Sequence, residues 1–490
     1  MTDLAPNVQE NMHSKQTGQS RKQKLEQYFS SEPLAQLMAS MMDYREKTVK
    51  ILDPGAGAGS LFLACVKAIC SKKNRPDRIE VTSYEIDRFL SDQLDDALSQ
   101  AESICDKAGI SFTGHMIRDD FVRSYAESEM ARFTHVIMNP PYKKINASSK
   151  QYRLLRSMNL RTTNLYSAFV SIACSLLKDG GQMTFISPRS FCNGAYFQPF
   201  RRRFLESMSV RRIHRFNSRR SSFDADGVLQ ENIIVCAKKC SRRGNLLITS
   251  SYGPGDPMTR RRMHTSDVIL EDDPQHFIHI VPDKLNASVS YKMRNLKTTL
   301  QDLGIKVSTG KVIDFRMSDA LRFHNVKKSV PLVRPSNISR GITHFPIYDQ
   351  KHHNFIIVNE SSRKWLIKND VYVLVKRFTT MEEKKRIVAS IWTKDIHNSD
   401  LVGFENKTNY FHCNGSGLDE LTAKGLWIFL NSTIVDSYFR QFNGHTQVNA
   451  TDLRYLKYPT SAQLKRLGNI QTEMNQEKID EAVQQIFLGD

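Results

Sequence analysis

A strand, a glycine-rich turn and a helix are predicted in direct succession near the start of the chain. The apolar run at residues 48–53 enters a turn that carries Gly55, Gly57 and Gly59, and residues 61–66 then continue at helical spacing. Glycines allow the backbone of such a turn to approach a ligand closely. This succession forms the first unit of a doubly wound nucleotide-binding sheet, whose ligand lies at the carboxyl ends of the strands. The pattern therefore predicts an α/β fold with a Rossmann-like parallel sheet.

The chemistry of this turn differs from that of a dinucleotide site. Its glycines have the spacing G-x-G-x-G instead of G-x-G-x-x-G, and Asp53 stands at the end of the strand. A phosphate-binding P-loop is excluded as well, because no Gly-Lys-Ser/Thr closes the turn. A carboxylate at this point would repel a pyrophosphate but would pair with a cationic amino acid group. Asp53, Gly55, Ala56 and Gly57 are therefore candidate contacts to a ligand with such a group.

Two further strand ends carry acids. The strand pattern at residues 79–84 ends at Glu85, where a carboxylate can accept hydrogen bonds from both hydroxyls of a ribose, and Ile86 beside it is expected at the same ligand. At the third strand end, Asp120 can accept from an adenine amino group and Phe121 can pack on the ring. Acids at strand ends are also common surface residues, so each of these signals is weak when taken alone.

The sequence Asn139-Pro140-Pro141-Tyr142 follows another apolar run, at residues 134–138. Proline has no N–H to donate and keeps the residue before it extended, so the strand stops here. The carboxamide of Asn139 and the carbonyl of Pro140 can then converge as two acceptors beside the flat ring of Tyr142. Two acceptors and a stacking surface suit a planar group that bears an NH2. An ordinary strand-to-loop turn is the alternative.

The motifs DPGAGAGSLF, YEID, RDDF and NPPY, in this order, resemble those of gamma-type DNA (adenine-N6)-methyltransferases, which use S-adenosylmethionine. The stretches NLYSAF, LKDGGQMTFISP, VLQENIIV and GHTQVNATDLR extend the resemblance to restriction-modification methylases of the BsuBI/PstI kind. The resemblance implies an S-adenosylmethionine-dependent catalytic domain at residues 25–240, which acts on a flipped adenine through Asn139, Pro140, Tyr142 and Phe223. It also implies double-stranded DNA as the substrate, a site of the CTGCAG type, and a cognate restriction endonuclease.

Two residues take their expected roles from this resemblance alone. Phe223 stands where the family places an aromatic ring against the extruded adenine, and a core phenylalanine is the alternative. Ahead of the glycine turn, the family usually carries Tyr-Phe-Thr-Pro, whose neighbours close over the methionine end of the cofactor. This chain has Tyr28-Phe29-Ser30-Ser31, so Ser30 is expected to take the place of the threonine.

Positive charge is concentrated after the catalytic motif. The chain has a net charge of +19, and residues 189–262 carry sixteen Lys and Arg against five Asp and Glu, a net of +11. A concentration of this kind favours contact with DNA phosphates, and the first candidates are Arg201, Arg202 and Arg203. The basic loop at residues 143–150 is also expected at the DNA backbone. A solvated protein surface is the alternative.

The second half of the chain shows no further glycine turn or catalytic motif. We predict a mixed α/β target-recognition domain at residues 241–490, joined through the polar region 242–262, with a strand at 371–378 and helices at 381–391 and 426–439. Asn, Gln and Lys match base edges in the major groove, so the polar loops 407–410 and 443–447 are expected to read bases. Residues 1–24 are polar and lack apolar periodicity, which predicts a disordered arm.

Cysteine usage and hydropathy indicate the cellular context. The eight cysteines are scattered without a C-x-x-C pair, which predicts reduced thiols, no disulfide and no metal site. No leader and no run of eighteen apolar residues is present, so we expect a cytoplasmic monomer without a membrane span. Three alternatives stay open: an RNA adenine methyltransferase, a protein glutamine methyltransferase, which also uses Asn-Pro-Pro-Tyr, and a DNA-binding module without catalysis.

Overall fold

The computed structural model describes residues 30–488, except 128, 130, 218–230, 241–243, 272, 281–283, 340, 350, 381–382, 444–445 and 471–474. The arm predicted at residues 1–24 and the predicted base contact Phe223 therefore lie outside the described residues. Contacts between residues divide the chain into two compact units, Met1–Pro282 (unit 1) and Asp283–Asp490 (unit 2).

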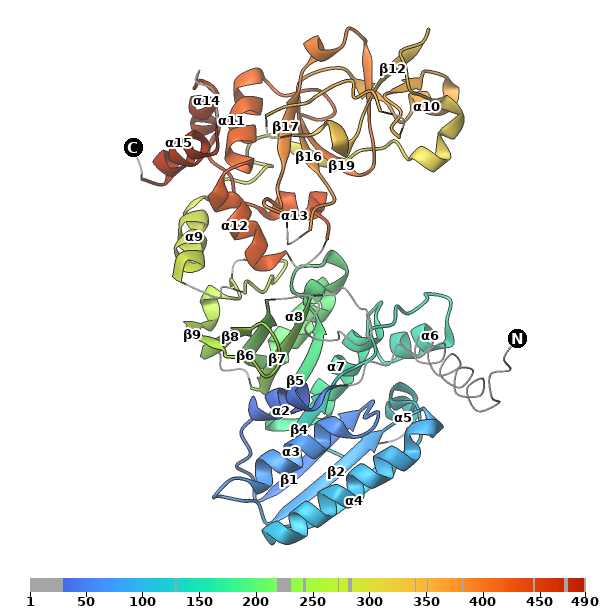
Figure 1. Ribbon diagram of the computed structural model, residues 1–490, viewed down its shortest axis with the longest axis vertical. Helices are drawn as coiled ribbons and strands as arrows, with labels where there is room; N and C mark the ends of the chain where they lie inside the picture. The colour runs from blue at the N-terminus through green and yellow to red at the C-terminus, as the bar shows by residue number, and fades with distance from the viewer. Residues whose placement is uncertain are drawn as a thin grey trace, which may run out of the picture. The chain divides into compact units, whose positions relative to one another are not determined.

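Unit 1 is built on a nine-stranded sheet with the order β3-β2-β1-β4-β5-β7-β6-β8-β9 (Figure 1). Neighbouring strands from β3 to β5 are parallel, whereas β7 runs antiparallel to both β5 and β6. The strand order reverses between β1 and β4, and α/β sheets bind ligands outside the strand ends at such a switch point. The strands are β1 Thr48–Pro54, β2 Arg78–Tyr84, β3 Ser111–Ile117, β4 Phe133–Met138, β5 Leu177–Pro188, β6 Met208–Phe216, β7 Asn232–Lys239, β8 Asn245–Ser251 and β9 Thr259–His264.

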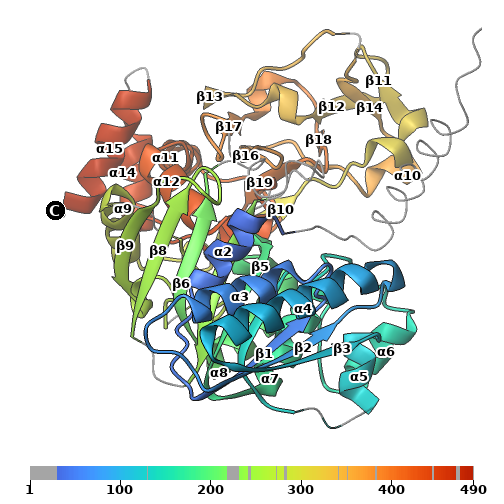
Figure 2. The ribbon, with the colours of Figure 1, turned by 60° about the horizontal axis from the view of Figure 1, so that its bottom comes forward.

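Helices cover both faces of this sheet. Figure 2 shows α2, α3 and α4 on one face and α5 and α7 on the other. All six residues of β4 are buried, because a central parallel strand is covered on both sides. The helices of unit 1 are α2 Glu32–Ser40, α3 Ser60–Cys70, α4 Ser91–Ala108, α5 Phe121–Glu127, α6 Lys150–Ser157, α7 Leu165–Leu176 and α8 Gln198–Ser207. This architecture confirms the predicted α/β fold with a doubly wound sheet.

The sheet continues beyond residue 240, where we expected the catalytic domain to end. β8 pairs in parallel with β6, from Arg212↔Leu247 to Phe216↔Ser251, and β9 pairs antiparallel with β8. These strands attach residues 245–264 to unit 1, which extends to Pro282. The polar region 242–262 therefore contains two strands and does not serve only as a linker. Its arginines lie largely on β9, and charged side chains are common on such an edge strand.

Unit 2 contains two five-stranded sheets, with the orders β10-β19-β16-β17-β13 and β11-β14-β12-β18-β15. Among the helices that the structure describes, none combines the length and apolarity that a bilayer crossing needs. The strands of unit 2 are β10 Lys306–Thr309, β11 Leu321–Arg322, β12 Ser329–Val333, β13 Gly341–Ile342, β14 Phe355–Ile357, β15 Ile367–Lys368, β16 Tyr372–Lys376, β17 Ala389–Trp392, β18 Leu401–Phe404 and β19 Thr408–His412. The helices are α9 Lys284–Asn295, α10 Glu360–Arg363, α11 Glu420–Leu430, α12 Thr433–Phe442, α13 Ala450–Tyr455, α14 Ser461–Gly468 and α15 Gln476–Leu488.

The elements predicted in this half of the chain are partly confirmed. The strand predicted at residues 371–378 is β16. The helix predicted at 381–391 is wrong, because residues from Ala389 onward form β17 and pair antiparallel with β16; pairing with a distant strand overrides local helix propensity. The helix predicted at 426–439 is divided between α11 and α12, because the side chain of Ser432 accepts the Val435 N–H and caps α12.

Two glycines set the spacing of α11 and α14. A Cβ atom at Gly425 would lie 1.9 Å from the carbonyl oxygen of Leu464, and a Cβ atom at Gly468 would lie 1.9 Å from that of Leu421. We expect Gly425→Ala to lower the free energy of unfolding by about 3 kcal/mol, because overpacking against backbone outweighs the roughly 1 kcal/mol gained in helix propensity. The urea midpoint measures this loss. Gly255→Ala, with no atom within 4 Å of the added Cβ, is the control and should match the parent.

Candidate active site

The carboxyl group of Asp53 is fully buried at the carboxyl end of β1. Neither carboxylate oxygen has a hydrogen-bond partner among the described residues. Burial raises the pKa of Asp53 to about 8; the nearby Phe62 N–H opposes this rise without making a hydrogen bond of normal geometry, and the Glu85 carboxylate adds to it. A buried acid without partners is unfavourable unless a positive charge lies beside it. This site therefore suits the cationic group that the sequence predicted.

The glycine turn is tied to the end of β2. The N–H groups of Gly55 and Ala56 both donate to the carbonyl oxygen of Tyr84, at 2.9 Å each. The Gly57 N–H donates to Oε2 of Glu85, also at 2.9 Å. Gly55 and Gly57 have φ angles of 91° and 55°, in the left-handed region that favours glycine. The turn is thus fixed in a shape in which its backbone lies beside the ends of β1 and β2.

Glu85 both holds this turn and keeps capacity for a ligand. Its Oε2 accepts the Gly57 N–H, and its Oε1 accepts the Asp87 N–H at 2.7 Å. Burial raises the pKa of Glu85, and these two N–H groups oppose the rise. A carboxylate has about four acceptor sites, so each oxygen retains one that a ribose hydroxyl can use. The neighbouring Ile86 is 58% exposed, which leaves an apolar surface beside the acid.

The third strand end combines a helix cap with a buried ring. Oδ1 of Asp120 accepts the Val122 N–H at 2.8 Å and so caps α5, which leaves Oδ2 for a ligand amino group. Phe121 is only 2% exposed, and its ring centroid lies 5.2 Å from that of Tyr84 and 5.1 Å from that of Phe169. Packing in the protein accounts for this ring, and its contact with an adenine stays a prediction.

Asn139 follows β4 at the switch point of the sheet. Its Nδ2 donates to Oγ of Ser30 at 3.4 Å, which brings together two residues that are 109 positions apart. A carboxamide that donates through nitrogen presents its oxygen as an acceptor. The ring of Tyr142 is partly buried and meets Tyr166 edge-on, with centroids 6.1 Å apart. The structure therefore places Ser30, Asn139 and Tyr142 around the end of β4, as the sequence motifs suggested.

A polar group at the neighbouring strand ends was not predicted. Arg189, directly after β5, is fully buried, and its Nη1 lies 2.5 Å from Oε1 of Glu231. Asn232 opens β7 opposite Pro188 and is 2% exposed, and neither end of its carboxamide has a partner among the described residues. A buried amide without partners suits a hydrogen-bonding ligand. The signal was present in VLQENIIV, where the polar residues Glu231 and Asn232 come directly before a buried apolar run.

The predicted phosphate contact of Arg201 is wrong. Arg201 is fully buried, and its guanidinium donates to three backbone carbonyls at 2.7–3.1 Å, those of Phe191, Gly194 and Gln275. These bonds make Arg201 an internal anchor of unit 1. Arg202 and Arg203 are exposed, so their contact with DNA stays a prediction.

Of the seven described residues in the two loops predicted to read bases, four are buried, whereas Lys407 and Thr446 are exposed and Gln447 is half-buried, so that contact between these three and DNA stays a prediction. Residues 408–412 form β19, which is buried along its whole length, and Nδ2 of Asn409 donates to the Val448 carbonyl at 2.7 Å. Asn443 is fully buried and donates to Oδ2 of Asp452 at 3.0 Å. The prediction is wrong for Asn409 and Asn443, because their buried amides form hydrogen bonds with groups inside unit 2. Residues 444 and 445 lie outside the described residues.

The cysteines and possible metal ligands show no further site in the described part of the chain. The sulfur atoms of Cys70 and Cys105, both buried, lie 4.0 Å apart. Over the same residues, no three His, Cys, Asp or Glu side chains are grouped so that they could hold a metal ion.

The chain is similar to methyltransferases of restriction-modification systems. The model of the family described as Eco57I restriction-modification methylase matches residues 52–223. Type II methyltransferase M.PstI of Providencia stuartii is 42% identical, over 94% of this chain and 92% of its own length. Type II methyltransferase M.BsuBI of Bacillus subtilis is 39% identical, over 96% of this chain and 95% of its own. Among solved structures, the type IIL restriction-modification enzyme MmeI in complex with DNA has a TM-score of 0.54 at 12% sequence identity. The match covers 93% of this chain and 71% of the MmeI chain, so the two proteins share the fold.

Proposed function

Because this chain belongs to the family of type II restriction-modification methyltransferases, we propose that it methylates the exocyclic amino group of one adenine within a specific site of double-stranded DNA, with S-adenosylmethionine as the methyl donor. The observation that carries the proposal is the placement of Asp53, Glu85 and Asn139 at the ends of β1, β2 and β4, around the switch point of the sheet. The alternatives, an RNA adenine methyltransferase and a protein glutamine methyltransferase, would use the same three groups.

The residues at these strand ends fit S-adenosylmethionine. The partnerless carboxyl of Asp53 suits the ammonium group of the methionine moiety, and the free acceptor sites of Glu85 suit the ribose hydroxyls. Ser30 lies beside Asn139, where the methionine end is expected. When bound, the cofactor supplies a methyl group on a sulfonium, which is its own activated leaving group.

The target adenine cannot be reached inside a duplex, so it must be flipped out at a cost of a few kcal/mol. In this proposal, stacking on Tyr142 and Phe223 offsets this cost. The oxygen of the Asn139 carboxamide and the carbonyl of Pro140 then accept hydrogen bonds from the adenine amino group. These bonds localise the lone pair of the nitrogen and aim it at the methyl carbon, so positioning supplies most of the acceleration.

The proposal includes a cellular setting. We infer a cytoplasmic monomer whose methylation protects DNA from a cognate restriction endonuclease, and a palindrome of the CTGCAG type is the first site to test. The experiment is incubation with tritiated S-adenosylmethionine and separate duplex DNA, RNA and release-factor acceptors, followed by nucleoside analysis. We expect label in N6-methyladenine of DNA. Label confined to RNA or to protein would overturn the proposal in favour of the corresponding alternative.

Replacing Glu85 with alanine should weaken S-adenosylmethionine binding. The change removes the acceptors for the ribose hydroxyls and for the Gly57 N–H, which is worth about 1.5–3 kcal/mol or roughly one to two decades in dissociation constant. Isothermal titration calorimetry measures the loss. Asp96→Ala, an exposed acid on α4, is the matched control and should bind like the parent. An unchanged affinity in Glu85→Ala would mean that the ribose lies elsewhere.

A further inference from the structure

Two loops of unit 2 expose large apolar side chains. The first spans residues 311–328, which include the two-residue strand β11, and carries Phe315 and Phe323, which are 79% and 38% exposed. The second spans residues 343–353 and carries Tyr348, which is 66% exposed. Single exposed apolar residues are ordinary, but several in adjacent loops indicate a binding surface. We call these two segments together the two-loop surface.

Ring contacts join the two loops. The ring of His324 stacks on that of Tyr348, with centroids 5.6 Å apart and planes at 23°. The ring of Phe323 lies against that of His353, with centroids 4.1 Å apart. Each contact takes one ring from each loop, so the exposed rings of Phe323 and Tyr348 belong to a single surface.

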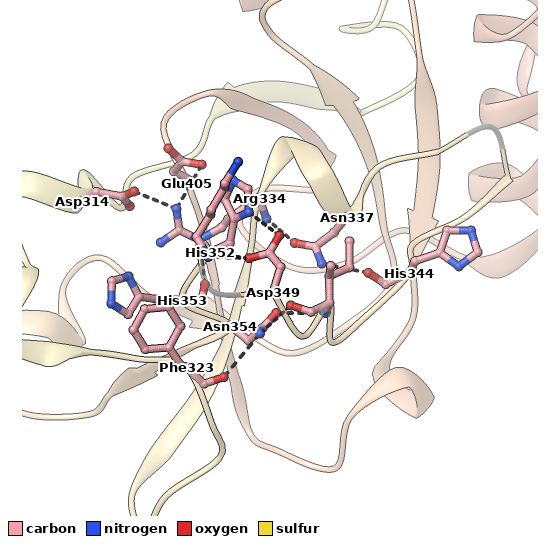
Figure 3. Close-up of polar contacts among 12 residues, drawn as sticks. Asp314, Phe323, Arg334, Asn337, His344, Asp349, His352, His353, Asn354 and Glu405 are labelled. Atoms are coloured by element: carbon pink, nitrogen blue, oxygen red, sulfur yellow. Dashed lines mark hydrogen bonds and ion pairs between the residues drawn. The ribbon is translucent and has the colours of Figure 1, made fainter.

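A buried carboxamide holds the backbones of both loops. Asn354 is 2% exposed, and its Nδ2 donates to the carbonyl oxygens of Phe323 at 3.3 Å and Ile347 at 2.8 Å (Figure 3). Its Oδ1 accepts the Ile347 N–H at 3.0 Å. One side chain therefore fixes a point in each loop.

A buried guanidinium adds a second attachment. Arg334 is 5% exposed; its Nε donates to the His353 carbonyl at 2.6 Å, and its Nη1 lies 2.7 Å from Oδ2 of Asp314 and 3.7 Å from Oε2 of Glu405 (Figure 3). The two loops are thus held in place by the interior of unit 2, which lowers the ordering cost when a partner binds.

The charge of the two-loop surface is basic. Residues 311–328 carry five Lys and Arg against two Asp, and residues 343–353 carry one Lys and one Asp. Two of these three carboxylates are already paired: Asp314 with Arg334, and Asp349 with His352 at 2.7 Å. Arg316, Lys327 and Lys328 are exposed. Basic groups neutralise phosphates, and apolar rings pack against bases or wedge between base steps.

We propose that the two-loop surface contacts the target duplex, with its basic side chains on phosphates and its rings and histidines against the bases. This inference rests on the proposed function, and it assigns to 311–328 and 343–353 a task that the buried Asn409 and Asn443 cannot perform. A protein partner would be the other occupant of an exposed aromatic surface, but the surplus of positive charge favours nucleic acid.

The phosphate contacts are tested with the full-length double variant Arg316→Gln/Lys327→Gln. Its affinity for a duplex that carries the target sequence of the enzyme should fall roughly tenfold. The slope of log affinity against log salt should become shallower by about 0.9 for each lost contact. The control is Lys465→Gln/Lys478→Gln, two exposed lysines elsewhere in unit 2, which should keep the parent slope. A slope equal to that of the parent in the first variant would overturn the phosphate assignment.

The ring contacts are tested with Tyr348→Ala, and Tyr291→Ala, whose ring is 70% exposed on α9, is the control. The affinity for a duplex with the target sequence, divided by the affinity for an unrelated duplex, should fall roughly tenfold in Tyr348→Ala and stay constant in Tyr291→Ala. An equal ratio of affinities in Tyr348→Ala and the parent would show that the rings do not contact DNA. That result would overturn the proposal even if the variant changed the self-association of the protein. If the parent itself methylates no DNA, the proposed function fails; if the parent does and both surface variants match it, only this inference fails.

Discussion

Alanine in place of Asn139 should reduce methyl transfer to duplex DNA roughly a thousandfold or more, while the affinities for S-adenosylmethionine and DNA change little. The substitution removes an acceptor for the adenine amino group and leaves the glycine turn, Asp53 and unit 2 unaltered. Losing one preorganised hydrogen-bonding group in a reaction centre costs about two to three orders of magnitude in turnover, and the Asn139 oxygen also orients the attacking nitrogen. A loss in turnover without a loss in binding marks an interaction made chiefly in the transition state.

Single-turnover kinetics with enzyme in excess separate this effect from product release. Asn74→Ala, an exposed asparagine in the loop after α3, is the matched control and should retain the parent rate. Ser30→Ala removes the acceptor of the Asn139 Nδ2 bond but leaves the Asn139 carboxamide in place, so a smaller, roughly tenfold loss is expected. Near-normal turnover of Asn139→Ala would move the catalytic centre away from Asn139-Pro140-Pro141-Tyr142.

Asp53→Asn should have two opposite effects. It should raise the free energy of unfolding of the cofactor-free protein, and it should weaken the binding of S-adenosylmethionine. The buried carboxyl has no hydrogen-bond partner among the described residues, and burial keeps it protonated up to about pH 8. An amide of the same shape cannot ionise, so it removes the cost of protonating this group on folding. The same change removes the anionic partner of a buried ammonium group, which costs about 3–5 kcal/mol, or roughly two to four decades in dissociation constant. Calorimetry at constant pH measures the binding loss.

The folding effect depends on pH in a defined direction. The pKa of Asp53 is about 8 in the folded chain against an ordinary value of 3.8, so between these values the unfolded chain has lost a proton that the folded chain keeps. The contribution of Asp53 to stability is present in full below about pH 4 and declines by about 1.4 kcal/mol per pH unit until the pH passes the folded pKa. The urea midpoint of Asp53→Asn should therefore rise relative to that of the parent between pH 5 and 8.

The exposed acid Asp96, changed to Asn, provides the control for this pH series and should follow the parent. Saturating S-adenosylmethionine should narrow the difference in urea midpoint between Asp53→Asn and the parent, because a positive charge beside Asp53 favours its ionised form. Parallel pH profiles of the parent and Asp53→Asn would show that Asp53 is ionised in the folded chain and that its partner has been missed.

The catalytic sheet and its strand-end residues could be predicted because their signals are local. The glycine turn, the double proline after β4 and the acids after β2 and β3 each stand next to the strand that positions them. A doubly wound sheet then brings the strand ends to one edge, whatever the lengths of the connecting segments.

The residues that the sequence did not place depend on distant partners. Arg201 looks like a phosphate ligand in an arginine run, but the Gln275 carbonyl that accepts from it is 74 positions away. Asn409 looks like a base-reading side chain, yet it bonds to a carbonyl 39 positions away. The helix expected at 381–391 is replaced by β17, since its pairing partner β16 lies outside any local window. A polar side chain has the same local pattern whether water or a distant carbonyl satisfies it.

The way the two-loop surface is attached to unit 2 determines which of its residues can be substituted without loss of the attachment. Asn354 and Arg334 bind backbone carbonyls of Phe323, Ile347 and His353, and such bonds are indifferent to the side chains at those positions. Mutations at the exposed positions can therefore accumulate while these backbone attachments stay in place, although the ring contacts between the loops depend on the side chains. If the loops read DNA, a lineage of such enzymes can acquire a new target sequence in small steps while methyl transfer in unit 1 goes on unchanged. Grafting both loops from a relative, with Asn354 and Arg334 kept, would exchange the target sequence in a single step.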